Sequence, residues 1–157
     1  MSKAKPKKQA LRLIKNKTVA IAVSRFNEFI TQRLCQACVE ELRTAGISAS
    51  NIKIIYTPGA YELPLACLKL ARKRNIDAVI ALGAVIRGET FHFELVAENA
   101  ARGILEVALM TGKPVIFGVI TTDTVKQAYA RSREKGDNKG RDAAEAALQM
   151  MAALSKI

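Results

Sequence analysis

Apolar residues along the chain gather in four short runs, and longer segments with helical spacing separate these runs. The runs are rich in Val, Ile and Ala and cover residues 18–23, 52–56, 78–82 and 115–120. Short, continuously apolar runs are typical of strands that are buried on both faces of a parallel sheet. Each of the four runs is therefore predicted to be a strand.

The segments between these runs carry helix signals. A helical pattern of apolar positions extends from about Glu28 to Ala45, and Gly46 is its stop signal. Pro64 suits the first turn of a second helix, which continues to about Lys73. The remaining helices are predicted from about Thr90 to Met110, Thr124 to Arg133 and Arg141 to Leu154.

The order of these elements, βαβαβαβαα, predicts the fold class. Strands that alternate with helices form parallel sheets, and right-handed crossovers place the helices on both faces. We predict an α/β protein: a three-layer αβα sandwich with a flavodoxin-like, four-stranded parallel sheet. Ligands of such sheets bind outside the carboxyl ends of the strands. Residues 24–27, 57–62, 83–92 and 121–123 are therefore expected to form one rim with a binding site.

Positive charge is concentrated at the start of the chain. The chain has 157 residues, the size of one domain, and a formal net charge of +11. Lys and Arg supply seven positive charges among the first 17 residues, which contain no acidic residue, so the rest of the chain carries 11 − 7 = +4. We interpret residues 1–16 as a basic tail and residues 17–157 as the domain. No recognition module accompanies the charge, so nucleic acid is not an expected partner.

Several other classes of function find no support in the chain. No apolar run approaches the ~20 residues of a membrane-spanning helix. The N-terminus lacks the apolar core of a secretion signal, so we expect a cytoplasmic protein with no membrane partner. Cys35 and Cys38 have the spacing of a redox pair, but they lie inside a predicted helix and not at its start. With Cys67, they are interpreted as small buried side chains and not as metal ligands.

The most unusual segment is residues 83–104, GAVIRGETFHFELVAENAARGI, which contains His92, the only histidine. The turn Gly88-Glu89-Thr90 at a helix start would offer backbone N–H groups to a phosphate. A plain turn capped by Thr90 explains the same residues equally simply. His92 could exchange protons with a bound anion near neutral pH, or it could be an ordinary half-exposed histidine. Both alternatives stay open at this point.

Other residues on the predicted rim also have two interpretations. Phe26 could cover the core or stack on a planar ring. Glu62 could accept hydrogen bonds from hydroxyl groups, or its carboxylate could stabilise a helix N-terminus. A basic cluster could close over a phosphate or lie solvated in a loop; its members are Arg131, Arg133, Lys135 and Lys139. The residues by themselves indicate a site for a phosphorylated small molecule, and no particular substrate.

In combination, five segments resemble one family. Lumazine synthases, the penultimate enzymes of riboflavin biosynthesis, contain in this order and at these spacings SRFNEFIT, TPGAYELP, the segment 83–104, PVIFGVITTDT and NKGRDAAEAALQM. The resemblance covers about residues 17 to 155 and leaves the basic tail outside. It implies condensation of 5-amino-6-(D-ribitylamino)uracil with 3,4-dihydroxy-2-butanone 4-phosphate to 6,7-dimethyl-8-ribityllumazine, phosphate and water. It implies no metal and no organic cofactor.

The resemblance also implies roles for individual residues. His92 matches the family's proton-transfer residue, and Phe26 matches the aromatic residue that stacks on the pyrimidinedione ring. The residues that match the family's phosphate site are Glu89, Thr90 and Arg131. The other residues that match contacts to the pyrimidinedione and the ribityl chain are Ala60, Tyr61, Glu62, Ala84, Val85, Ile86 and Phe117.

Finally, the resemblance implies a homo-oligomer. Phe117 matches a residue that the family contributes from an adjacent subunit, so each active site would lie between two subunits. The family forms pentamers, and in some members twelve pentamers close into an icosahedral shell; the sequence leaves both assemblies open. Residues 11–15 match a strand that the family adds to a neighbour's sheet. The implied functional link is to riboflavin synthase.

Overall fold

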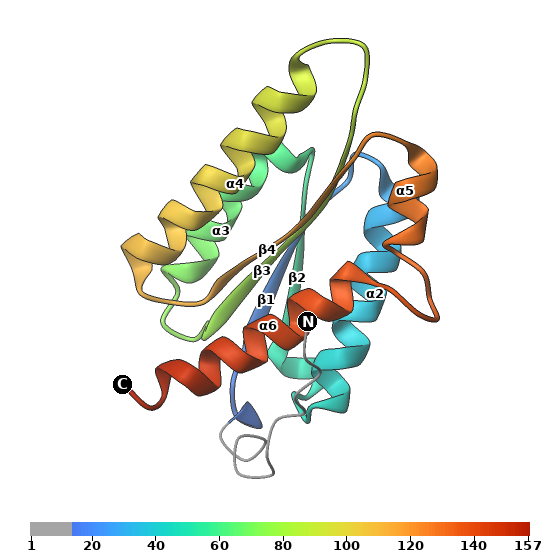
Figure 1. Cartoon of the computed structure of the whole chain (residues 1–157). Helices are drawn as coiled ribbons and strands as arrows, with labels where there is room; N and C mark the ends of the chain where they lie inside the picture. Colours follow the sequence, from blue (N-terminus) through green and yellow to red (C-terminus); the bar gives the residue numbers. More distant parts are fainter. Residues whose placement is uncertain (1–13) are drawn as a thin grey trace.

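Four parallel strands form the centre of the computed structural model, which describes residues 14–157 (Figure 1). The strands are β1 (Val19–Ser24), β2 (Ile52–Thr57), β3 (Ala78–Ile86) and β4 (Val115–Thr122). Their order in the sheet is β2-β1-β3-β4, and each neighbouring pair is parallel. The predicted flavodoxin-like sheet is therefore confirmed.

Helices cover both faces of this sheet (Figure 1). On one face α2 (Glu28–Thr44) packs against α6 (Lys139–Leu154), and the short α5 (Val125–Ala130) lies on the same side. On the other face α3 (Leu63–Ala71) packs against α4 (His92–Thr111). Two short 3-10 helices, η1 (Ala49–Asn51) and η2 (Ala60–Glu62), complete the described elements. The predicted three-layer sandwich is confirmed.

The pattern of β1 explains why two apolar cores form. Successive side chains of a strand point to opposite faces of the sheet. Ile21 and Val23 accordingly belong to the core under α2 and α6, whereas Ala20 and Ala22 belong to the core under α3 and α4. All six residues of β1 are buried, as a central strand between two helical layers requires.

Two strands extend farther than the apolar runs predicted. β3 continues to Ile86 and β4 to Thr122, because residues 83–86 pair in register with residues 119–122. The predicted strand 78–82 stopped before Gly83, but Gly83 lies within β3, where an added Cβ would stand only 3.2–3.3 Å from atoms of Ser24, Leu63 and Val119. The glycine reflects close packing of the strand and not its end.

Helix ends also differ from the prediction. α6 begins at Lys139 and not at Arg141, because the side-chain oxygen of Asn138 caps it and accepts a hydrogen bond from the Gly140 N–H at 2.9 Å. α4 begins at His92, two residues after Thr90. α5 ends at Ala130, so Arg131 follows the helix and does not lie within it.

The three cysteines are free, buried thiols, which confirms their interpretation as small core side chains. Burial raises the pKa of the Cys67 thiol to about 12, and it raises the pKa values of Cys35 and Cys38 as well. Within residues 14–157, no helix has the length and apolarity needed to cross a membrane. The predicted basic tail, residues 1–16, and the predicted added strand, residues 11–15, fall largely outside the described residues.

Candidate active site

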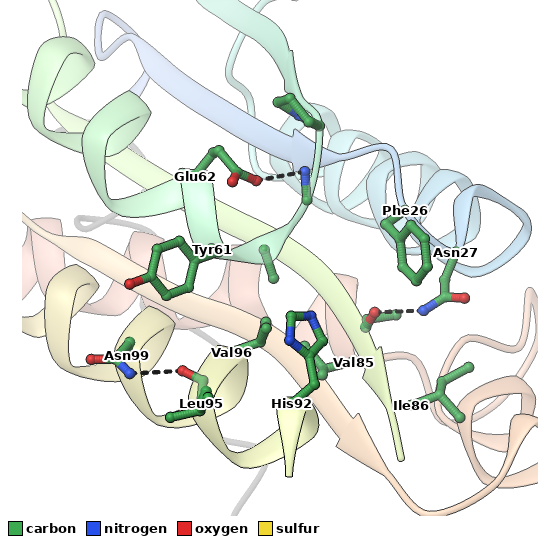
Figure 2. Close-up of a pocket in the computed structure, with 14 residues that line it drawn as sticks. Phe26, Asn27, Tyr61, Glu62, Val85, Ile86, His92, Leu95, Val96 and Asn99 are labelled. Carbon is green, nitrogen blue, oxygen red and sulfur yellow. Dashed lines mark hydrogen bonds between the residues drawn. The ribbon is translucent and has the colours of Figure 1, made fainter. Parts of the chain in front are cut away.

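A cavity of about 610 Å³ opens beside the carboxyl ends of the strands, where parallel sheets bind their ligands (Figure 2). Four segments line it: the β1–α2 turn, the β2–α3 turn with η2, the end of β3, and the first turns of α4. The predicted rim segments 24–27, 57–62 and 83–92 all contribute lining residues. Residues 121–123 do not; the Asp123 carboxylate instead accepts a hydrogen bond from Arg87.

Phe26 and Asn27 form one wall of this cavity. Asn27 has a left-handed backbone (φ 59°), a conformation that asparagine tolerates better than most residues. Its side-chain amide donates to the Ala84 carbonyl oxygen at 2.8 Å, which ties the turn to β3. The backbone N–H of Phe26 donates to the Pro58 carbonyl at 3.0 Å. These bonds hold the Phe26 ring at the rim with 72% of its surface exposed, so it does not cover the core.

The opposite wall comes from η2. Tyr61 is 58% exposed and borders the cavity, whereas Ala60 is buried beneath it. One carboxylate oxygen of Glu62 accepts a hydrogen bond from the Gly59 N–H at 2.9 Å (Figure 2). Glu62 therefore stabilises the start of this helical segment, which was one of its two predicted roles. The carboxylate retains a second oxygen that could accept from a ligand.

The floor and the remaining side of the cavity come from β3 and α4. Ala84, Val85 and Ile86 end β3 at the cavity and line its floor. On α4, one helix face borders the cavity; its residues are His92, Leu95, Val96 and Asn99. Figure 2 shows the His92 ring directed into the same space that Phe26 and Tyr61 border.

Three of these α4 residues were not predicted from the sequence. Leu95, Val96 and Asn99 lie three, four and seven positions after His92, which is the spacing of one helix face. That periodicity was available in the sequence once His92 had been placed at the start of a helix. Asn99 is held in place, because its side-chain amide donates to the Leu95 carbonyl at 2.8 Å.

The turn 88–91 lies directly before α4. Within the described part of the chain, its four backbone N–H groups donate no hydrogen bond. The residue before the helix is Phe91, which provides no side-chain cap, and the Thr90 hydroxyl accepts only a long bond from the His92 N–H at 3.4 Å. Unpaired N–H groups and the positive end of the helix dipole together attract an anion. The turn can therefore hold an anion beside His92.

Two predicted site residues lie elsewhere. Phe117 is 42% exposed on β4 and borders a separate hollow of about 190 Å³, together with Lys139. Arg131 lies just after α5, where its guanidinium donates to the Gln127 carbonyl at 3.1 Å. The N–H of Lys139 donates to the Arg131 carbonyl at 2.9 Å, so these residues share the β4–α6 side of the molecule. Neither Phe117 nor Arg131 lines the cavity of its own chain.

The arrangement has a defined chemical capacity. The cavity combines apolar walls and the exposed Phe26 ring with backbone groups, the side-chain amides of Asn27 and Asn99, and the single imidazole of His92. Such a lining suits a planar organic molecule with several polar atoms. The imidazole stands between this space and the turn that can hold an anion, so it can transfer protons between the two. Among residues 14–157, no three His, Cys, Asp or Glu side chains lie close enough to bind a metal ion.

Comparison with known protein families agrees with this arrangement. The model of the 6,7-dimethyl-8-ribityllumazine synthase family matches residues 16–155, which is nearly the whole chain. The match includes every segment that lines the cavity and also the segments with Phe117 and Arg131. The chain therefore belongs to the 6,7-dimethyl-8-ribityllumazine synthase family.

Proposed function

We propose that the protein is a transferase that condenses 5-amino-6-(D-ribitylamino)uracil with 3,4-dihydroxy-2-butanone 4-phosphate. The products are 6,7-dimethyl-8-ribityllumazine, phosphate and water, and no metal or organic cofactor takes part. Family membership implies a role in riboflavin biosynthesis, small-molecule substrates and an oligomeric assembly. The observation that carries the proposal is the cavity that groups Phe26, η2 and His92 beside a turn with unpaired N–H groups.

The pyrimidinedione binds at the Phe26 end of the cavity. An exposed ring at the rim can stack on a flat heterocycle in offset geometry, and Phe26 has that exposure. The backbone groups of Ala84, Val85 and Ile86 pair with the amide edge of the heterocycle. The ribityl chain extends along η2, where Ala60 and Tyr61 border it and the second carboxylate oxygen of Glu62 accepts from its hydroxyls.

The phosphate of the second substrate binds at the turn before α4. The N–H groups of Glu89 and Thr90 donate to it, and the dipole of the 20-residue helix α4 favours its charge. The backbone carries this contact, because the N–H groups of the turn donate no hydrogen bond within the described part of the chain. Arg131 supplies a guanidinium whose planar fork matches the phosphate oxygens.

His92 transfers protons in this reaction. The amine of the pyrimidinedione attacks the ketone and forms an imine with loss of one water, phosphate is eliminated, and ring closure releases a second water. A histidine next to the phosphate can serve both the imine step and the elimination. Much of the acceleration comes from holding two substrates in one cavity in the correct orientation. Loss of His92 therefore slows the reaction without abolishing it.

An adjacent subunit completes the site. Phe117 and Arg131 lie on the β4–α6 side, outside the cavity of their own chain, so a neighbouring copy can bring them to it. The assembly is a pentamer, alone or within an icosahedral shell of twelve pentamers. Residues 17–157 form the enzyme domain, the protein is cytoplasmic, and its product is the substrate of riboflavin synthase.

Turnover of the two proposed substrates tests this function. Purified protein that receives both compounds should release inorganic phosphate and form a product with the absorbance and fluorescence of a lumazine. Reactions that lack either substrate are the controls. A folded, assembled sample that binds the pyrimidinedione but releases no phosphate would instead be a binding protein on the same scaffold.

A further inference from the structure

Arg87 connects the ends of β3 and β4 to the first turn of α4, next to the residues of β3 and α4 that line the cavity. It follows β3, and its backbone N–H continues the sheet by donating to the Thr122 carbonyl at 2.8 Å. Its side-chain Nε donates to the Asp123 carboxylate at 2.9 Å, at the end of β4. Its terminal nitrogen bonds the Glu94 carboxylate in the first turn of α4. The guanidinium carbon also lies 4.2 Å from the centre of the Phe93 ring.

These contacts enclose the turn 88–91. Arg87 immediately precedes the turn, and Phe93 and Glu94 follow it by two and three residues, with only His92 between. One side chain therefore connects the beginning of the turn to its end. Asp123, the partner of Arg87 at the end of β4, is itself held in position, because its N–H donates to the side-chain oxygen of Gln127 at 2.8 Å.

The positive charge of Arg87 is paired with the carboxylates of Glu94 and Asp123. The two hydrogen bonds raise the pKa of the Arg87 guanidinium, and the bond with Arg87 lowers the pKa of Glu94. Two carboxylates around one guanidinium leave a net negative group, which does not attract a phosphate. A planar fork can bond both carboxylates and stack on Phe93 at once, whereas an ammonium cannot.

We propose that Arg87 is the positioning residue of the phosphate-binding turn. It holds residues 88–91 and His92 in the geometry that receives the phosphate, and it does not bind the phosphate itself. The phosphate role of this turn rests on the proposed function. The contacts of Arg87 with Glu94, Asp123 and Phe93 carry the new assignment, since they fix both ends of the turn.

The single histidine gives a direct measurement of the geometry of the turn. Diethyl pyrocarbonate modifies histidine with a change in ultraviolet absorbance that hydroxylamine reverses, and His92 is the only histidine in the chain. Inorganic phosphate that occupies the adjacent turn should slow this modification. The phosphate concentration that gives half protection measures anion binding at the turn without any turnover.

Arg87→Lys is the main variant, because it keeps the charge and removes the fork. We expect the half-protecting phosphate concentration to rise about tenfold and kcat to fall about tenfold, which corresponds to roughly 1.4 kcal/mol in each case. The KM for the pyrimidinedione, which binds at the Phe26 end, should change less than about twofold. A general loss of structure would instead raise both KM values.

Lys17→Gln is the matched control. Lys17 pairs with Asp77 at 3.2 Å, and the exposed fractions of this pair, 43% and 32%, resemble the 42% and 25% of Arg87 and Glu94. The Lys17 pair lies before β1, at the opposite end of the sheet from the cavity. This variant should keep wild-type protection, kcat and KM values.

A second variant separates positioning from direct binding. Glu94→Gln combined with Asp123→Asn leaves Arg87 in place but removes its two charged anchors. If Arg87 positions the turn, phosphate protection should weaken; if Arg87 is a phosphate ligand, the released guanidinium should strengthen it. Measurement near 1 M salt, where the screening length is about 3 Å, suppresses the long-range effect of the lost negative charges. This variant also decides the question if Arg87→Lys does not fold.

Several outcomes would overturn the inference. One is wild-type phosphate protection in Arg87→Lys, and another is tighter phosphate protection in the double variant. Absence of phosphate protection in the wild type would overturn it too, whatever the turnover. Failure of the proposed function would look different. The wild-type protein would then not convert the two substrates, while phosphate would still protect His92 in the wild type and protect it less well in Arg87→Lys.

Discussion

The two helix pairs that cover the sheet meet in different ways. α6 contacts α2 at Gly140, where an added Cβ would stand 1.9 Å from the carbonyl oxygen of Leu34. α4 contacts α3 at Gly103, where an added Cβ would stand 2.7 Å from carbons of the Pro64 ring. The first contact joins backbone to backbone, and the second joins backbone to a side chain. The α2–α6 pair therefore approaches more closely at its glycine than the α3–α4 pair does.

The outer surfaces of the two layers differ as well. α4 directs large apolar side chains to solvent: Leu105 and Met110 are more than half exposed, and Leu109 is 77% exposed. The same helix provides His92 and one side of the cavity. The family implies oligomeric assembly. The exposed apolar surface of α4 is available for contacts with other subunits, in addition to the β4–α6 side that carries Phe117 and Arg131.

Gly140→Ala should have the largest effect of the changes considered. In an ordinary helix position, alanine in place of glycine stabilises by about 1 kcal/mol. At Gly140 the added methyl group would overlap the backbone of α2, so the two helices must separate. We expect the free energy of unfolding to fall by about 4 kcal/mol or more, or the protein not to fold. Urea denaturation and calorimetry measure this change.

Two glycine variants serve as comparisons. Gly103→Ala should cost about 1–3 kcal/mol, because the Pro64 ring can shift by a small amount. Gly88→Ala should alter stability by less than about 0.5 kcal/mol, since an added Cβ there meets nothing within 4 Å. Equal losses for Gly140→Ala and Gly103→Ala would show that the two helix contacts tolerate an added methyl group equally.

The fold could be predicted from the sequence because the apolar pattern of each strand and helix is contained in a short segment of the chain. The residues of β1 are apolar on both faces, and only a central strand between two layers requires this. The order of strands and helices then located the rim. The predicted ends of the strands were less accurate. A glycine such as Gly83 can end a strand or can permit a close contact, here with Leu63, and the sequence alone does not distinguish the two.

The predicted site was only partly assembled by one chain. Phe26, Tyr61 and His92 meet because the topology brings the turns after β1 and β2 and the start of α4 to one rim. Phe117 and Arg131 do not join them. The resemblance implied an adjacent subunit as the source of Phe117, whereas nothing in the sequence indicated that Arg131 also lies outside the cavity of its own chain. The contacts of Arg87 were not predicted, since they depend on the tertiary positions of residues 7 and 36 places along the chain.

Two variants and their mixed assemblies test whether a neighbouring subunit completes the site. His92→Ala should lower kcat at least about tenfold, up to the roughly hundredfold that begins the usual range for a general acid–base, because holding the two substrates together supplies part of the acceleration. Arg131→Ala should mainly raise the KM for the phosphorylated ketone, roughly tenfold, because a charged hydrogen bond is lost. Neither variant should change the assembled mass, which light scattering measures. An equal rise in KM for the pyrimidinedione would show that Arg131 is misassigned.

Co-expression of the two variants in equal amounts gives the decisive comparison. If each site combines His92 of one subunit with Arg131 of another, about a quarter of the sites contain both native residues, one half times one half. At low ketone concentration the mixture should then exceed the activity of either variant severalfold. If one chain supplied both residues, every site would lack one of them, and the mixture would show only the mean of the two variants.

The smallest expected effect tests whether the two layers are alike beneath their surfaces. Cys67 lies in the core under α3 and α4, and Cys38 lies in the core under α2 and α6. Burial raises the pKa of Cys67 from 9.0 to about 12 and also raises that of Cys38. A raised pKa stabilises the folded state below the unfolded value. The stabilisation is lost as the pH rises from about 9 towards about 12.

Cys67→Ala should therefore reduce the alkaline loss of stability. Between about pH 8 and pH 10, the free energy of unfolding of the wild type should fall by about 1 kcal/mol more than that of the variant. Cys38→Ala should behave in the same way, because its thiol is buried as completely. Urea denaturation at the two pH values measures the difference. If one of the two variants kept the full alkaline loss of the wild type, water would reach the core around the replaced cysteine, and the layers would then differ in their interiors as well as at their surfaces.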